Sequence, residues 1–302
     1  MKPPLFPRRT FLSILSALCL LGAVTKPVEA GSSATESDSP HENFIPPNVR
    51  TPAEEPFPGV FASYAGETVF LIRCGEKSVL VDTGYLHNTD AHLDNFEAAG
   101  VDLDTIAVIF TTHPHVDHVA GLAHARARLK CPVVAHKNAV HIIERGDRVL
   151  SAAYMPFVGW DFPFPACEVD EAIDDGDTLE VADITFTVVH TPGHTPGCVS
   201  YLWDGKLISG DVLFASGRIG WMDAHWGSNF LDMLDTLDRI DKIAPDHLLP
   251  THGAPFPYDS SITQEARETS KLFLDHKLSG VLGQTRRAEL RDPESATRTL
   301  QY

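Results

Sequence analysis

Residues 111–118 read Thr-Thr-His-Pro-His-Val-Asp-His and follow directly on the apolar run Ile106–Phe110. Three histidines and one carboxylate therefore fall within six positions, where a buried strand is expected to end and a loop to begin. Neutral imidazole and carboxylate are the ligands that suit Zn²⁺, and also Fe²⁺ or Mn²⁺. A solvated surface rarely needs such a cluster, and a core tolerates it only with a metal or with polar partners. This stretch predicts a metal site.

Four other segments have the same form, in which an apolar run is followed by a turn that carries Asp or His. They are Asp82-Thr83-Gly84, the turn from Thr191 to Gly197 that contains His194, Ser209-Gly210-Asp211 and Thr251-His252-Gly253. Such an arrangement gathers side chains along one edge of a sheet, where ligand sites tend to lie. We therefore expect these residues to converge on the histidines of the first stretch.

Taken in order, these five motifs resemble those of the metallo-β-lactamase-fold hydrolase superfamily, and the resemblance covers roughly residues 60–255. It implies an α/β fold, a four-layer αββα sandwich. It also implies two metal ions, expected to be Zn²⁺ with Fe or Mn as alternatives, and a hydroxide held between them that attacks a carbonyl carbon. By match to the superfamily, one ion has three histidine ligands, the second has Asp117 and two histidines, and Asp211 bridges both. The histidines are His113, His115 and His194 for the first ion and His118 and His252 for the second.

Two aspartates have further expected roles. Asp117 could also orient the attacking hydroxide. Asp82 resembles an outer partner that fixes a ligand histidine, and its alternative role is that of a turn-forming residue before Thr83-Gly84.

The residue at position 211 discriminates between branches of the superfamily. Metallo-β-lactamases generally have Cys or Ser there, whereas Asp211 resembles the pattern of glyoxalase II-like thioesterases and lactonases. The resemblance thus implies a hydrolase for an ester, thioester or lactone. Two alternatives stay open: a β-lactamase-type amidase, and a persulfide dioxygenase of the same fold with a single iron.

The first 30 residues are expected to be an export signal. Arg8-Arg9 precedes an apolar run from Phe11 to Val24 that is too short to span a bilayer, and Val28-Glu29-Ala30 is a plausible cleavage site. The paired arginines resemble a twin-arginine signal, with an ordinary secretory signal as the alternative. The expected location is therefore the periplasm or the exterior. No membrane span is expected in the mature chain.

Charge excludes nucleic-acid substrates. The chain of 302 residues has 24 basic and 41 acidic residues, and removal of residues 1–30 leaves 20 and 40, a net charge of −20. Phosphate backbones require concentrated positive charge. A small-molecule substrate is expected instead, and the sequence does not indicate an oligomeric state. Cys74, Cys131 and Cys198 are expected to be small buried apolar residues.

Composition divides the rest of the chain into a flexible lead-in at residues 31–58, a catalytic domain at 59–258 and a C-terminal helical tail at 259–302. Period-two and period-3.6 patterns place the regular elements within this domain and tail. Strands are expected at Val69–Arg73, Ser78–Val81, Ile106–Thr111, Val133–Ala135, Ile184–Val189, Val199–Trp203, Lys206–Ser209 and His247–Leu249. Helices are expected at Asp90–Ala99, Ala120–Leu129, Ala139–Arg145, Phe230–Ile243 and Thr263–Leu278.

An aromatic, proline-rich segment, Leu150–Glu168, interrupts this pattern. It is either a wall over an apolar substrate or a loop that packs its aromatics onto the body of the protein. The candidate substrate-pocket residues are Phe157, Trp160 and Phe162 from this segment, with His225 and Trp226 from a second loop.

Overall fold

The computed structural model describes the backbone of residues 51–282 and the side chains of residues 51–274. The expected export signal, most of the lead-in and the end of the C-terminal tail lie outside the described residues. Within the described part of the chain, no helix has both the length and the apolar character needed to cross a bilayer.

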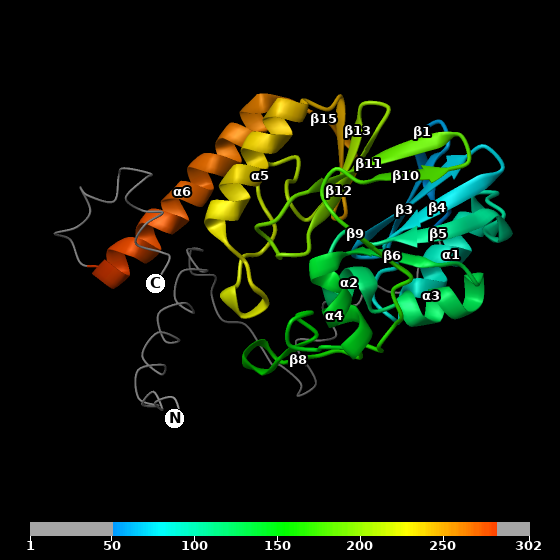
Figure 1. The fold of residues 1–302 in the computed structure, drawn as a ribbon, viewed down its shortest axis with the longest axis horizontal. Helices are drawn as coiled ribbons and strands as arrows, with labels where there is room; N and C mark the ends of the chain where they lie inside the picture. Colours follow the sequence, from blue (N-terminus) through cyan, green and yellow to red (C-terminus); the bar gives the residue numbers. More distant parts are fainter. Residues whose placement is uncertain (1–50, 283–302) are drawn as a thin grey trace, which may run out of the picture. The chain divides into compact units, whose positions relative to one another are not determined.

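Two mixed sheets form the centre of the fold (Figure 1). The first sheet has the strand order β1-β2-β3-β4-β5-β6-β9, and the second runs from β10 to β15 in sequence order. The first consists of β1 (Glu54–Phe57), β2 (Val60–Tyr64), β3 (Thr68–Cys74), β4 (Lys77–Val81), β5 (Ile106–Phe110), β6 (Val133–His136) and β9 (Glu171–Ile173). The second consists of β10 (Thr178–Val181), β11 (Ile184–His190), β12 (Val199–Trp203), β13 (Lys206–Gly210), β14 (His247–Pro250) and β15 (Phe256–Pro257).

Helices cover the outer face of each sheet (Figure 1). Those on the first sheet are α1 (Thr89–Ala98), the short α2 (Val116–Val119), α3 (Leu122–Leu129) and α4 (Lys137–Arg145). Those on the second sheet are α5 (Phe230–Ile243) and α6 (Ser260–Leu282). Between residues 51 and 282, three short 3₁₀ helices lie in connections: η2 (Leu103–Thr105), η3 (Pro156–Val158) and η4 (Ala224–Trp226). A separate hairpin pairs β7 (Tyr154–Met155) with β8 (Trp160–Asp161).

The alternation of apolar side chains along each strand explains this layering. In β3, Val69 and Leu71 pack under the helices, whereas Phe70 and Ile72 pack between the two sheets. Successive side chains of a strand point to opposite faces, so a strand with two apolar faces must be covered on both sides. The result is the four-layer αββα sandwich that the sequence predicts, with one core between the sheets and one under each helical layer.

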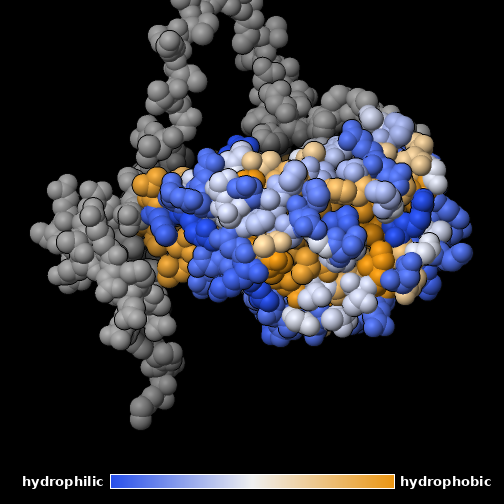
Figure 2. All heavy atoms as spheres, turned by 90° about the horizontal axis from the view of Figure 1, so that it is seen from above, coloured by the Kyte–Doolittle hydropathy of each residue, from blue (hydrophilic) through white to orange (hydrophobic). Residues whose placement is uncertain are grey.

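The face drawn in Figure 2 carries hydrophilic side chains over most of its area, with smaller patches of hydrophobic residues between them. Some of the large hydrophobic side chains that stay exposed belong to the aromatic segment and its neighbouring loop, namely Tyr154, Phe157 and Trp221. Others, Leu272 and Phe273, lie on α6. Isolated exposed apolar residues are normal, but the first group lies beside the site described below.

The two predicted boundaries of the catalytic domain differ from those in the structure. Strand β1 lies within the predicted lead-in and pairs with β2, so the predicted domain start at residue 59 is too late. The predicted tail begins with α6, whose Arg267 binds Asp238 and Asp241 of α5 and whose Ala266 is fully buried. This helix is therefore part of the packed fold.

The four cysteines at 74, 131, 167 and 198 are all buried free thiols. Burial raises the pKa of both Cys74 and Cys198 to about 12. The prediction that Cys74, Cys131 and Cys198 act as small buried residues is confirmed.

Candidate metal centre

Strand ends from both sheets deliver the candidate ligands to one place. His113 and His115 follow β5, and Asp117 and His118 lie in the short helix α2. The remaining three candidates follow β11, β13 and β14, and they are His194, Asp211 and His252. Strands β4 and β5 run parallel, as do β13 and β14, so within each pair the residues that follow the strands emerge at the same edge.

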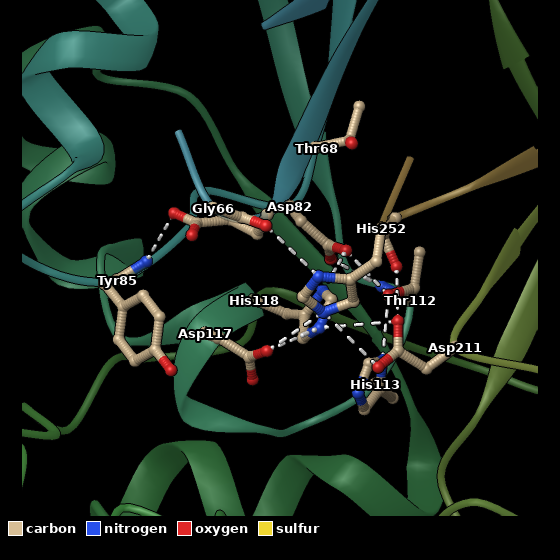
Figure 3. A network of polar contacts seen from close by, with 12 residues as sticks. Gly66, Thr68, Asp82, Tyr85, Thr112, His113, Asp117, His118, Asp211 and His252 are labelled. Carbon is tan, nitrogen blue, oxygen red and sulfur yellow. Dashed lines mark hydrogen bonds and ion pairs between the residues drawn. The ribbon is translucent and has the colours of Figure 1, made fainter. Parts of the chain in front are cut away.

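The seven side chains form two adjoining groups. Within each group, one ligand atom of every member lies within 4.8 Å of the others. The first group is His113, His115 and His194, and the second is Asp117, His118, Asp211 and His252. The first group is the set of three histidines that the resemblance implies for one ion. The second group contains the three residues that the resemblance implies for the other ion, together with Asp211, which the resemblance assigns to both. Figure 3 shows the second group and His113 converging from different strands and turns.

Asp211 belongs to the second group and also approaches the first. Its Oδ2 is 3.8 Å from His194 Nε2 in the first group and 3.5 Å from His252 Nε2 in the second, and its Oδ1 is 3.6 Å from His118 Nε2. The hydroxyl of Thr251 donates a 3.0 Å hydrogen bond to Oδ1 and fixes the carboxylate. This position allows one carboxylate to face two ions.

Hydrogen bonds at Nδ1 orient the rings of four of the five candidate ligand histidines. His118 Nδ1 lies 3.2 Å from Asp82 Oδ2, and His194 Nδ1 donates to the carbonyl of Trp221 at 2.8 Å. His113 Nδ1 lies 3.1 Å from the Thr112 hydroxyl, and His252 Nδ1 lies 3.4 Å from the Gly66 carbonyl. A partner at one ring nitrogen fixes the tautomer and leaves the other nitrogen as the ligand. In each of these residues Nε2 is therefore left to face the cluster.

Asp82 organises this outer layer. Its carboxylate accepts hydrogen bonds from the Thr112 backbone N–H at 2.8 Å and from the Thr112 hydroxyl at 2.6 Å, besides its contact with His118. It is fully buried and adopts a φ of +63°, a conformation that Asp tolerates better than most residues. The structure thus places Asp82 where the sequence expected it, against a candidate ligand histidine.

The buried donor atoms fit a divalent cation. The Nε2 atoms of His113, His115 and His194 are buried and have no hydrogen-bond partner among the described residues. Leaving a buried polar atom unpaired costs about 1–3 kcal/mol. Three such atoms facing one point match the ligand set of a zinc ion, for which imidazole nitrogen is a preferred donor.

Charge in the cluster is divided between the groups. Burial, together with neighbouring imidazoles, holds the pKa values of His113, His115 and His194 below the usual range, so these rings are neutral and able to ligate. Burial opposes a charge on His252, but Asp211 and Asp117 outweigh it and raise its pKa to about 9. Bound cations would take the place of protons in the second group.

A buried hydrogen-bond network around Glu67, not anticipated from the sequence, supports the loops beside the candidate ligands. Glu67 accepts hydrogen bonds from His92 Nε2 at 3.0 Å and from the Tyr85 backbone N–H at 3.2 Å. The adjacent Thr68 N–H donates to the Thr251 carbonyl at 2.7 Å. The turn between β2 and β3 therefore supports the Tyr85 loop on one side and the His252 loop on the other.

Only part of the predicted substrate pocket lies at the cluster. Trp160 and Trp226 line a pocket together with the candidate ligands. Phe162 packs against Tyr85 and Trp160 at ring-centroid distances of 5.1 and 5.9 Å, behind the lining residues. Phe157 contacts His225, and neither residue lines the pocket.

Sequence reasoning missed two aromatic residues of this pocket, Tyr85 and Trp221. Tyr85 directly follows the Asp82-Thr83-Gly84 motif, and Trp221 lies in the same loop as Trp226. Proximity to a recognised motif was the available signal for the first, and the clustering of tryptophan in one loop was the signal for the second.

Comparison with known proteins agrees with this geometry. Residues 65–275 match the family model of the metallo-beta-lactamase superfamily. The chain belongs to the metallo-beta-lactamase superfamily. It is a hydrolase of this superfamily with a candidate metal-binding cluster of histidine and aspartate.

Several members of the superfamily resemble this chain over much of its length. A human acyl-coenzyme A thioesterase is 26% identical over 233 residues, which cover 70% of this chain and 81% of that protein. A probable metallo-hydrolase of Methanocaldococcus jannaschii is 26% identical over 198 residues, which cover 63% of this chain and 88% of that protein. A hydroxyacylglutathione hydrolase of Bdellovibrio bacteriovorus is 29% identical, but the match covers only 57% of that protein.

Among solved structures, the subclass B3 metallo-beta-lactamase BJP-1 of Bradyrhizobium japonicum matches with a TM-score of 0.61. The match covers 80% of this chain and 98% of that one, at 24% identity. At this identity the likeness establishes the shared fold.

Proposed function

We propose that this chain is a dinuclear zinc hydrolase that acts on the carbonyl group of an ester, thioester or lactone. The observation that carries the proposal is the position of Asp211, whose two oxygens face both ligand groups. When bound, two divalent cations would polarise a carbonyl group and ionise water near neutral pH. Thioesterases among the relatives support a carbonyl substrate.

The chain's own residues prepare the site for this chemistry. Five imidazoles and two carboxylates supply seven donor groups, and Asp82, Thr112 and the Trp221 carbonyl fix the orientation of several of them. Preorganised groups need no rearrangement during the reaction, which lowers the barrier. Aromatic side chains line the pocket beside the cluster, and an apolar lining of this kind limits the access of water to the reacting groups.

Asp117 has a second possible use. Its Oδ2 lies 3.1 Å from His252 Nε2 and 3.3 Å from His118 Nε2, and its side chain is about one-fifth exposed. It therefore lies at the edge of the cluster that opens to the pocket. We assign it the additional role of orienting the attacking water by hydrogen bonding.

Metal analysis and kinetics of Asp211→Asn test the proposal. The wild-type protein should contain two zinc ions per chain and hydrolyse esters, thioesters or lactones. The variant should retain about one ion and lose at least about a thousandfold in kcat/KM, because the shared carboxylate is lost. Full activity of the variant at unchanged metal content would contradict the proposal.

The same analysis separates the alternatives. A single iron per chain, with sulfite formed from a persulfide, would indicate a dioxygenase. Turnover of β-lactams alone would indicate an amidase. Two zinc ions per chain, together with hydrolysis of oxygen esters or thioesters, would support the proposed hydrolase.

We also propose that the protein is exported through a twin-arginine-type signal. The support lies in Arg8-Arg9, the short apolar run that follows, and Ala30 at the expected cleavage site. Replacing both arginines with lysine keeps the charge, and it should retain the unprocessed chain in the cytoplasm. Normal processing of that variant would favour the general secretory route.

A further inference from the structure

Three tryptophans form a wall beside the candidate ligands. Trp160 comes from the β7–β8 hairpin, whereas Trp221 and Trp226 come from the loop before α5. The rings of Trp160 and Trp221 lie 5.9 Å apart at 80°, and those of Trp221 and Trp226 lie 5.8 Å apart at 85°. Edge-to-face packing of this kind gives a rigid apolar surface.

The wall and the cluster are physically joined. The ring of Trp226 packs edge-on against His115 at 5.0 Å, and the Trp221 carbonyl holds His194 Nδ1. Gly220 permits this approach, because a Cβ there would lie 2.5 Å from the Asp211 carbonyl oxygen. A group bound on the wall would therefore lie next to the reacting carbonyl. Trp221 is 51% exposed, so the wall is accessible from solvent.

The wall carries little positive charge. The described residues that line the pocket include no Lys or Arg, and they do include Asp117 and Asp211. Three basic side chains occur on the loops that carry the tryptophans, and none of them lines the pocket. The exposed Arg218 donates a 2.9 Å hydrogen bond to the Ser216 hydroxyl. Arg148 binds Asp161, and His225 lies 2.6 Å from Asp223.

This arrangement does not suit an anionic carrier. Coenzyme A carries several phosphate charges and glutathione carries two carboxylates, and such groups are usually held by Arg or Lys. A chain with a formal net charge of −17 would also repel them at a distance. An uncharged aromatic group, in contrast, can stack on tryptophan and remove apolar surface from water.

We propose that Trp160, Trp221 and Trp226 form the leaving-group subsite for a substrate whose leaving group is uncharged and aromatic. This inference rests on the proposed hydrolase function and names its substrate class. It sets this chain apart from relatives named for coenzyme A and glutathione thioesters.

A matched series of acetyl thioesters tests the inference with the zinc-loaded protein. S-benzyl thioacetate, S-ethyl thioacetate, acetyl-coenzyme A, S-acetylglutathione and acetylthiocholine share one acyl group, and each releases an alkyl thiol. Release of thiol can therefore be followed in the same way for all five. We expect kcat/KM for the benzyl compound to exceed that for coenzyme A and glutathione at least about tenfold.

Trp221→Ala provides the matched variant, because its backbone carbonyl remains available to His194. It should lower the ratio of kcat/KM for the benzyl compound to kcat/KM for the ethyl compound about tenfold, chiefly through KM for the benzyl compound, while the zinc content stays near that of the wild type. Phe273→Ala is the control, since Phe273 is a similarly exposed aromatic on α6 (55%) that does not line the pocket. It should leave the preference for benzyl intact.

A binding measurement keeps the inference separate from the proposed function. Benzyl methyl sulfide cannot be hydrolysed and should change tryptophan fluorescence at lower concentration than S-methylglutathione. If no thioester in the series is hydrolysed, the thioesterase part of the proposed function fails, and this comparison alone decides the subsite. Faster turnover of an anionic thioester or of acetylthiocholine, an unchanged benzyl preference in Trp221→Ala, or tighter binding of S-methylglutathione would each overturn the inference.

Discussion

The ligand cluster and the tryptophan wall adjoin each other, yet they are built differently. The cluster sits at the ends of strands in two sheets, and its histidines at 113, 115, 118 and 194 are almost completely buried. The wall comes from two loops, and its side chains range from buried Trp226 to half-exposed Trp221. Strands fix positions to a few tenths of an ångström, whereas loops can vary without loss of the core.

This difference divides function between the two regions. The strand ends determine which reaction is possible, because they place the metal donors. The loops determine which substrate enters, because they supply the surface beside the donors. Changes to the cluster should therefore reduce the rate for every substrate, and changes to the wall should alter the preference among substrates.

Metal removal should separate the regions most strongly. Chelation should lower the rate for all substrates more than about a thousandfold and reduce the midpoint of thermal unfolding, and zinc should restore both. Binding of benzyl methyl sulfide, followed by fluorescence, should change by less than about threefold. Loss of that binding together with the metal would show that the wall depends on the cluster.

Asp82→Asn should weaken the cluster from outside. The amide cannot accept hydrogen bonds from His118 and Thr112 as the carboxylate does, so we expect a loss of about 10- to 100-fold in zinc affinity or activity. Competition with a chelator measures the affinity. The exposed Asp183→Asn is the control and should behave as wild type. Normal zinc affinity in the Asp82 variant would reduce this residue to a turn former.

His136 shows that a strand-end histidine need not join the cluster. It is fully buried at the end of β6, its ring stacks on His190 at 4.2 Å, and its Nε2 lies 3.6 Å from Asp174. Burial has the largest effect on the pKa of His136 and lowers it, and the nearby His190 and Lys137 lower it further. Asp174 opposes this shift only in part, so the pKa falls to about 4.

The sign of the resulting pH dependence follows from this lowered pKa. The unfolded chain, with a histidine pKa near 6.5, binds the proton more readily. The contribution of neutral, buried His136 to the free energy of unfolding is therefore fully present above about pH 6.5 and is lost as the pH drops toward 4. In the metal-free protein, His136→Asn should reduce this fall by about 1–3 kcal/mol, as measured by urea unfolding at several pH values. Identical slopes for wild type and variant would contradict the assignment.

The smallest effect is expected at Phe157, which lies on the same hairpin as Trp160 but outside the tryptophan wall. Phe157 is 56% exposed and contacts His225 without lining the pocket. Phe157→Ala should change kcat/KM for the benzyl thioester by less than about twofold. A tenfold loss would mean that the β7–β8 hairpin closes over the substrate during turnover.

The sequence was informative where polar residues interrupt apolar strands. Asp211 and His252 could be assigned to one edge because each follows a strand-like run, and superfamily motifs supplied the grouping that spacing alone does not give. Strand β1 was missed because its sequence, Glu-Glu-Pro-Phe, contains two charges and a proline that are compatible only with an edge strand.

The pocket was less predictable for a physical reason. Position along a loop does not determine which side chain faces a site, so Phe157 and Trp160 could not be distinguished by sequence, although only Trp160 lines the pocket. Glu67 was missed for a similar reason. Its role depends on His92 and Tyr85, which lie 18 to 25 residues away and meet it only in the folded chain.

The most direct test of the account is the anomalous scattering of zinc in crystals of the metal-loaded protein. The account predicts two peaks per chain, one within His113, His115 and His194 and the other within Asp117, His118 and His252, with Asp211 in contact with both. A single peak, or two peaks that do not share Asp211, would contradict it.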